Sequence, residues 1–63
     1  MASRVHVLDW RPISTAPEGL VVHTKVDDGR GVRNVQKLRR CGALWWFPDG
    51  SMYVYYTPTH WAP

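Results

Sequence analysis

Residues 20–40 read LVVHTKVDDGRGVRNVQKLRR, and this stretch decides the fold class. Its first part, residues 20–26, is rich in β-branched side chains and alternates apolar with polar residues after Val22, which predicts a strand. The DDGRG sequence contains Asp-Gly, a strong hairpin signal. Residues 32–40 then form the expected return strand, whose basic side chains would protect an exposed edge. The stretch therefore predicts an antiparallel hairpin.

Three further segments predict strands, and turn residues separate the strands about every ten residues. They are residues 4–8 (RVHVL), 43–47 (ALWWF) and 52–56 (MYVYY). Residues 11–19, RPISTAPEG, have the composition of an ordered loop. The spacing of Val32, Val35 and Leu38 would also fit two helical turns, but β-branched residues favour a strand there.

We therefore expect one small all-β domain over residues 1–63. It would be an antiparallel meander of four to five strands, forming an SH3-like barrel or a strongly bent sheet. A domain of this size buries only about 60% of the surface that its unfolded chain exposes. Four tryptophans, three tyrosines and one phenylalanine supply large core side chains. Trp45 and Trp46 must face opposite sides of their strand, and the sequence leaves open which of them is exposed.

The composition indicates a cytoplasmic protein. Cys41 is the only cysteine, which excludes a disulfide within the chain and fits a reducing compartment better than a secreted one. No apolar run is long enough to span a membrane, and charged residues interrupt any signal-peptide core near the start. Whether the Cys41 thiol is reactive stays open at this point.

The basic residues are unevenly distributed along the chain. Five of the eight Lys and Arg residues lie between positions 30 and 40, where there is no acidic residue. Because Trp, Tyr and Arg dominate the hot spots of protein interfaces, we expect a site that binds a protein partner. The expected partner-binding residues are Arg33, Lys37, Arg39, Arg40, Trp46, Tyr53 and Tyr55.

Other uses of the same residues stay open. Basic side chains beside aromatic rings also suit single-stranded nucleic acid, although a net charge of +3 is low for that role. The exposed ring could instead form the seam of a homodimer. The basic strand could also be no more than a solvated edge, with most of the rings in the core.

We expect neither an enzyme nor a metal or cofactor site. The potential zinc ligands are His6, His23, His60 and Cys41, but no pair of them has the short spacing of a zinc site. Cys41 lies in a predicted turn without the surroundings of an acyl-enzyme nucleophile. The acidic residues lie mainly in or beside turns, where Asp is expected for conformational reasons.

Motifs at the two ends of the chain together resemble a known family. DWRPISTAPEG, residues 9–19, and PTHWAP, residues 58–63, are similar to a family of short phage and prophage domains of unknown function. That family carries W-x-P-I-x-x-A-P-x-(D)-G at the front and P-T-H-W-x-P at the end. CGALWWFPDG, residues 41–50, resembles its Gly-Trp-rich middle. The resemblance implies no activity. It does imply a phage origin, the host cytoplasm as location, and a host or anti-phage defence protein as partner.

The same two motifs predict a structural clasp, whatever the family. Its residues are Trp10, Pro12, Pro17, Pro58, His60 and Trp61. The prolines rigidify both segments and lower the entropy that folding costs. We expect Trp10 to pack against Trp61 where the termini meet. We expect the His60 ring to hydrogen-bond a backbone group in the 10–19 loop, with contact to a partner as the alternative.

Overall fold

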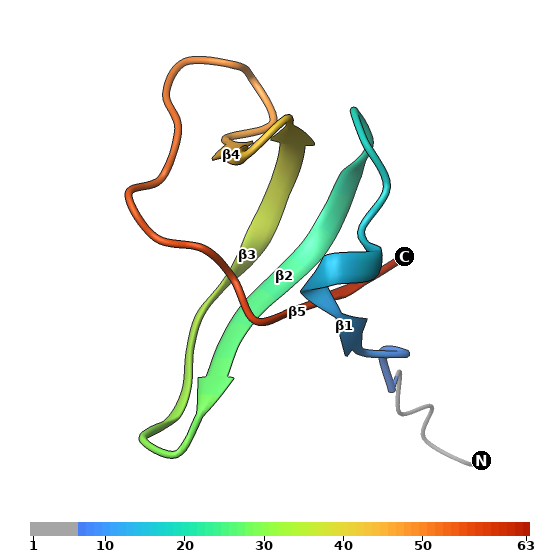
Figure 1. Ribbon diagram of the computed structural model, residues 1–63, viewed down its shortest axis with the longest axis vertical. Coiled ribbons are helices and arrows are strands. Elements are labelled where there is room, and N and C mark those ends of the chain that lie inside the picture. The colour runs from blue at the N-terminus through green and yellow to red at the C-terminus, as the bar shows by residue number, and fades with distance from the viewer. Residues whose placement is uncertain (1–6) are drawn as a thin grey trace, which may run out of the picture.

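The two longest strands form a hairpin, which corresponds to the hairpin predicted for residues 20–40. In the computed structural model, which describes residues 7–63, β2 spans Val21–Asp28 and β3 spans Gly31–Cys41 (Figure 1). Asp28 pairs with Gly31, so Gly29 and Arg30 form a two-residue turn. The predicted hairpin is confirmed, with strand ends that differ by one or two residues.

All strands belong to one antiparallel sheet in the order β1-β5-β2-β3-β4. The shorter strands are β1 (Arg11–Pro12), β4 (Leu44–Trp46) and β5 (His60–Ala62), and a 3-10 turn, η1, covers Ile13–Thr15. The all-β prediction is therefore confirmed. Consecutive strands are neighbours only from β2 to β4, because β5 inserts between β1 and β2. The sheet is strongly bent and does not close into a barrel.

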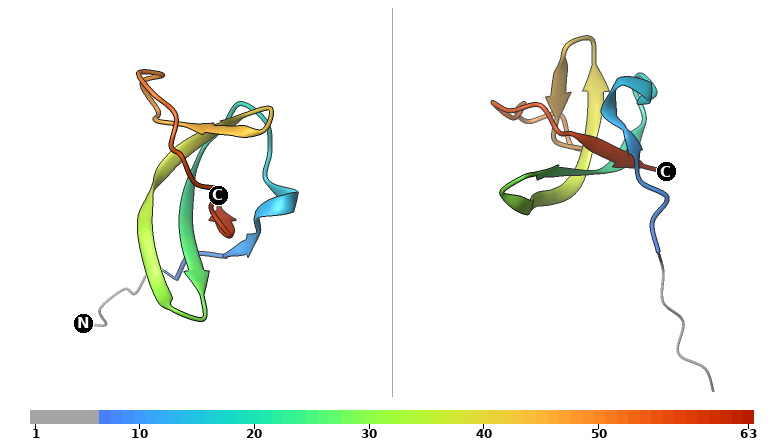
Figure 2. Two further views of the ribbon diagram at one scale, coloured as in Figure 1. Left: turned by 60° about the vertical axis from the view of Figure 1, so that its left-hand side comes forward. Right: turned by 60° about the horizontal axis from the view of Figure 1, so that its bottom comes forward.

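The bend gives the sheet a concave side. Figure 2 shows the β2–β3 hairpin curved along its length, with η1 and the segment between β4 and β5 on the inside of the curve. This segment, residues 47–59, which we call the crossing segment, holds Val54 and Pro58 in the interior. It also anchors Tyr56, whose hydroxyl accepts a hydrogen bond of 2.6 Å from Gln36 Nε2 on β3.

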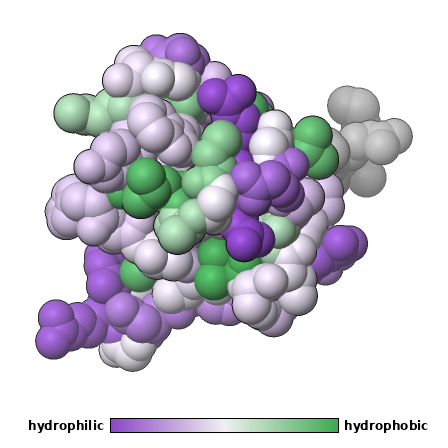
Figure 3. All heavy atoms as spheres, turned by 45° about the horizontal axis from the view of Figure 1, so that its top comes forward, coloured by the Kyte–Doolittle hydropathy of each residue, from purple (hydrophilic) through white to green (hydrophobic). Residues whose placement is uncertain are grey.

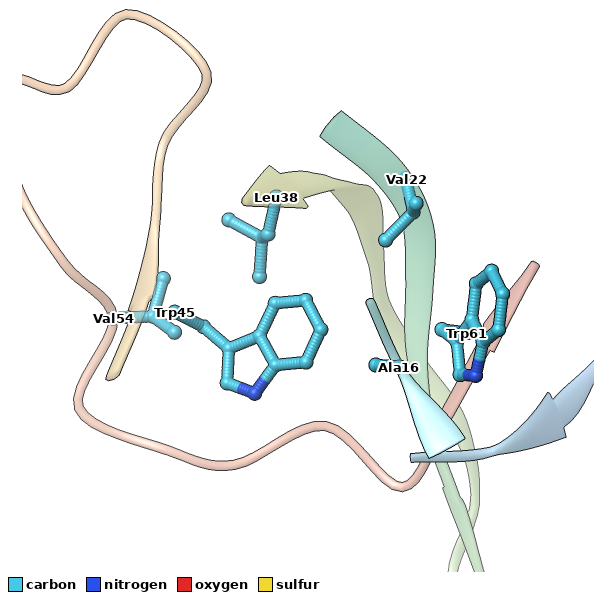
Figure 4. Close-up of a cluster of buried hydrophobic side chains, with 6 residues drawn as sticks. All are labelled: Ala16, Val22, Leu38, Trp45, Val54 and Trp61. Atoms are coloured by element: carbon cyan, nitrogen blue, oxygen red, sulfur yellow. The ribbon is translucent and has the colours of Figure 1, made fainter. Parts of the chain in front are cut away.

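The buried cluster on the concave side consists of Ala16, Val22, Leu38, Trp45, Val54 and Trp61 (Figure 4). Val22 and Leu38 are cross-strand partners, so they share this face. Thr24 is fully buried beside them, and its Oγ1 donates a hydrogen bond of 2.7 Å to the Gln36 carbonyl. The indoles of Trp45 and Trp61 thus supply much of the core volume, because so short a chain has few aliphatic side chains to fill it.

Two of the predicted strands differ from the structure. Residues 52–56 do not form a strand, and only Tyr53 makes an isolated bridge to Trp46. The segment leaves the sheet after Val54, whose N–H donates to the Trp45 carbonyl at 2.8 Å, and then crosses the concave side. Of the predicted strand at residues 4–8, positions 4–6 lie outside the described residues, and Val7 and Leu8 are not in a strand.

The strands at the two ends of the chain were not predicted. β1 falls within the Pro-rich segment that was expected to be a loop, and β5 falls within the C-terminal motif. Pro12 can lie in β1 because β1 is an edge strand, where a missing N–H is tolerated. Strands of two or three residues are also too short to show an alternating pattern.

Candidate binding surface on the outer face of the sheet

The side of the sheet opposite the core carries a row of side chains from three strands and from the segment that follows β4. Val21 on β2 pairs with Arg39 on β3, Arg39 pairs with Trp46 on β4, and Trp46 bridges to Tyr53. Cross-strand partners share a face, and Val21 alternates with buried Val22. We call Val21, Arg39, Trp46 and Tyr53 the outer row. Lys37 lies two residues from Arg39 along β3 and is therefore on the same face.

The structure answers which tryptophan is exposed. Trp45 is buried, with 4% of its surface accessible. Trp46 is only partly buried and packs edge-on against Tyr53, with ring centroids 5.3 Å apart and planes at 63°. Edge-to-face geometry of this kind holds both rings in place. Trp46 therefore presents a fixed aromatic surface beside Tyr53, which is half exposed.

Arg39 occupies the centre of the outer row without an acidic partner among the described residues. Its Nε is buried and finds no hydrogen-bond acceptor there. Its Nη2 lies over the turn that follows β4, 3.5 Å from where a Cβ on Gly50 would stand. The guanidinium is thus packed in place while its charge stays uncompensated, because no described carboxylate lies within 4 Å of it.

Ion pairs compensate, at least in part, most of the other basic side chains of the described residues. The pairs are Arg11–Asp9, Lys25–Asp27, Arg33–Asp28 and Arg40–Glu18. Within residues 7–63, the basic side chains outside any ion pair are Arg30, Lys37 and Arg39. Two of these three belong to the outer face, beside the rings. The excess positive charge therefore coincides with the outer row.

A bulge separates Arg33 from the other predicted site residues. Thr24 pairs with Gln36 but Val26 pairs with Arg33, so β3 carries one extra residue in this interval. Asn34 lies in it with φ 55°, a left-handed conformation. Arg33 consequently lies on the face of Val26, opposite to Lys37, although the two residues are four apart.

The structure brings together four of the seven predicted partner-binding residues. Lys37, Arg39, Trp46 and Tyr53 share the outer face. Arg40 pairs with Trp45 and belongs to the concave side. Tyr55 is 97% exposed on the crossing segment, where it packs edge-on against Tyr56. Val21 was not among the predicted site residues. It lies two residues before His23 in the same strand, so alternation places both side chains on the outer face.

Most of the predicted clasp residues lie at or beside the junction of β1, β5 and β2. Arg11 pairs with Trp61 and Pro12 pairs with His60. Trp61 is buried, and its Nε1 donates a hydrogen bond of 2.9 Å to Thr15 Oγ1. Pro58 is fully buried, and Pro17 is partly buried.

Two details of the clasp differ from the prediction. Trp10 does not form a ring pair with Trp61 in the described chain. Its ring lies under the Lys25 ammonium at 4.5 Å, while the Arg11 guanidinium lies 5.4 Å from the Trp61 ring centroid. The His60 ring bonds to its neighbour rather than to the front loop, with Nδ1 2.8 Å from Thr59 Oγ1. Trp10 and His60 therefore have other partners than those expected from the closeness of the two ends. The pairing of β1, β5 and β2 determines which way their side chains point.

Thr59 makes the contact to the front segment that was expected of His60. Its carbonyl accepts from the Ile13 N–H at 3.0 Å, and its own N–H donates to the Lys25 carbonyl at 2.9 Å. Its Oγ1 accepts from the Asp27 N–H at 2.8 Å. Thr59 therefore joins the front segment, β2 and the ending through its backbone and its hydroxyl group, which a sequence motif alone does not reveal.

Comparison of the chain with known protein families, curated proteins and solved structures finds no match. The similarity to short phage domains therefore stays a prediction, and the function must be argued from the geometry. Over residues 7–63, no three His, Cys, Asp or Glu side chains gather as metal ligands would. None of the helical structure in that range is long and apolar enough to cross a membrane.

Proposed function

We propose that this chain is a non-enzymatic binding module that uses the outer row and Lys37 to recognise an acidic surface of a partner protein. One observation carries the proposal: the uncompensated cations Lys37 and Arg39 lie on the same face as the fixed rings of Trp46 and Tyr53. Arg, Trp and Tyr are the side chains that contribute most to binding at protein interfaces. The positive charge sets the partner's sign by complementarity.

The size of the molecule fits an interface on one face. A standard interface takes about 800 Å² from each partner, which is roughly a sixth of the 4668 Å² that the chain exposes. On the face drawn in Figure 3, hydrophobic residues occur in small groups between hydrophilic ones. Scattered apolar residues of this kind are normal on the surface of a folded protein.

Nucleic acid is less well supported as a ligand of the same face. A protein that binds DNA tightly through its charge makes about 6–10 phosphate contacts. Among the described residues, the outer face offers only Lys37 and Arg39 as cations outside ion pairs. A homodimer through the outer row is disfavoured for another reason. A two-fold axis brings the same patch of both copies together, so like charges would oppose each other.

The resemblance to phage domains suggests what kind of protein the partner is. A host or anti-phage defence component with an acidic surface would satisfy both the resemblance and the charge of the outer face. This identity rests on the motifs at the two ends of the chain, and the outer row does not depend on it.

The test is affinity capture from a lysate with two matched pairs of variants. Lys37→Glu and Arg30→Glu change the net charge equally at exposed positions, but Arg30 is at the hairpin turn, away from the outer row. Trp46→Ala and Tyr55→Ala each remove a ring, and Tyr55 is outside the outer row. We expect acidic proteins that wild type, Arg30→Glu and Tyr55→Ala retain and that Lys37→Glu and Trp46→Ala lose. Retention of the same proteins by all five would refute the proposal.

A further inference from the structure

A cavity of about 340 Å³ opens on the concave side of the sheet, away from the outer row. Its walls come from η1, from the turn between β3 and β4, and from the crossing segment. They include Ile13, Ser14, Arg40, Ala43, Trp45 and Thr57. The volume is at the small end of the range for ligand sites in proteins. The outer row plays no part in this cavity, so the two sites are independent.

Hydrogen bonds hold Arg40 in the cavity wall, and its ion pair with Glu18 offsets its charge only in part. Its Nε donates to the Gly42 carbonyl at 3.0 Å, and its Nη1 donates to the Ala16 carbonyl at 3.0 Å. Carbonyl acceptors orient a guanidinium but do not neutralise it. The nearest carboxylate, on Glu18, is 3.8 Å from Nε, and its Oε2 accepts instead from the Gly42 N–H at 2.7 Å. No described residue accepts a hydrogen bond from Arg40 Nη2, so this nitrogen can donate to a ligand.

Trp45 contributes a second donor. Its side chain is almost completely buried, yet no acceptor in residues 7–63 bonds its indole N–H. Among the described residues, Arg39 Nε is the fully buried side-chain nitrogen or oxygen without a partner. The indole nitrogen must therefore be accessible, and the cavity is the open space that Trp45 lines. Figure 4 shows the nitrogen on the edge of the ring that points away from Leu38.

We infer that this cavity binds a carboxylate group that is attached to a small apolar moiety. Arg40 Nη2 and the Trp45 indole N–H supply charged and neutral donors, and Ser14 and Thr57, which carry hydroxyl groups, also line the cavity. Ile13 and Ala43 give the same cavity an apolar side. A planar carboxylate matches the planar guanidinium. A single cation, partly offset by Glu18, suits a monoanion better than a phosphate dianion.

The carboxylate could belong to a free metabolite or to the C-terminus of a peptide, and the probes distinguish the two. Benzoate represents a small free acid, N-acetyl-leucine represents a peptide C-terminus, and N-acetyl-leucinamide is its uncharged counterpart. The readout is the indole N–H resonance of Trp45 in the NMR spectrum of the full chain, followed during titration. We expect a saturable shift with at least one acid and none with the amide.

Two substitutions at Ala43 test the site without touching the core. Ala43 is an exposed turn residue in the cavity wall. Ala43→Asp adds a like charge and should weaken binding of the acid by at least about tenfold, whereas Ala43→Asn, of the same size, should change it less than about threefold. Arg30→Gln, at the exposed hairpin turn and outside both sites, should leave the titration unchanged. Equal shifts with acid and amide, shifts with inorganic phosphate alone, or equal binding by the two Ala43 variants would overturn the inference.

Discussion

The carboxylate of Asp28 shows how one residue couples the hairpin turn to pH. It accepts hydrogen bonds from Nη1 and Nη2 of Arg33, each at 2.9 Å, and from the Arg30 N–H at 2.9 Å. The bonds from Arg33 are the main reason that the pKa of Asp28 falls from 3.8 to about 2, and the Arg30 N–H contributes next. Bonds to the ionised form favour it, so protonation becomes harder in the folded chain.

The depressed pKa of Asp28 predicts a loss of stability in acid. Because the pKa is lower in the folded than in the unfolded chain, the contribution is present above about pH 4 and is lost as the pH falls from 3.8 towards 2. Urea midpoints of wild type and Asp28→Asn should therefore differ at pH 6 and approach each other at pH 2. A difference that stays constant over this range would show that the ion pair does not stabilise the fold.

Trp61 and Tyr55 predict opposite results for the loss of a ring. Trp61 is 7% exposed and Tyr55 is 97% exposed. Trp61→Ala should lower the free energy of unfolding by about 3–5 kcal/mol, whereas Tyr55→Ala should change it by no more than about 0.5 kcal/mol. Chemical denaturation followed by circular dichroism measures both. If Trp61→Ala is unfolded in buffer, Trp61→Phe should still fold, since it keeps a ring in the core.

At the level of elements, the bulge in β3 decides which charges share a face. Asn34 has φ 55°, and its side chain is exposed, so the position depends on backbone conformation rather than on packing. Asn tolerates the left-handed region better than most residues, and glycine adopts it freely. Without the extra residue, Arg33 would have the same orientation as Lys37.

Substitutions of Asn34 test this backbone requirement. Asn34→Val places a β-branched residue in the left-handed region and should destabilise the fold by about 1–2 kcal/mol. Asn34→Gly should remain within about 0.5 kcal/mol of wild type. The two free energies of unfolding, taken from urea titrations, give the comparison. Equal stability of the two variants would mean that the bulge can form without the left-handed residue.

Local sequence patterns predicted some of the strands and not others. The hairpin was predictable because its alternation and its Asp-Gly turn are local signals, and β4 followed from the same pattern. The alternation in residues 52–56 was misleading, because burial of Val54 and Pro58 draws that segment across the concave side. β5 exists through pairing with β2 and β1, and β1 through pairing with β5, and no local pattern encodes these contacts.

The candidate site was predictable only in part, for a related reason. Lys37, Arg39, Trp46 and Tyr53 were expected to bind a partner because of their residue types, and the pairing of the strands brings them to one face. Arg33 was misplaced because nothing in the sequence around Asn34 marks an extra residue. The ion pairs of Arg33 with Asp28 and of Arg40 with Glu18 were also not predictable, because they depend on contacts between segments.

For the whole molecule, the ion pairs limit how strongly it can bind a polyanion. Three cations of the described chain are outside ion pairs, and Arg4, which lies outside the described residues, brings the number to at most four. Each contact with single-stranded nucleic acid contributes about −0.7 to the slope of log K against log salt. The slope should therefore be no steeper than about −3.

Fluorescence anisotropy with a labelled single-stranded oligonucleotide, titrated between low and moderate salt, measures this slope. We expect weak binding with a shallow dependence on salt, and Lys37→Glu should make the slope shallower by about 1 or more. Arg33→Gln should leave it unchanged, since Asp28 already compensates that charge. A slope much steeper than about −3 would mean that the paired arginines also contact phosphates. Nucleic acid would then replace an acidic protein as the better candidate ligand of the outer row.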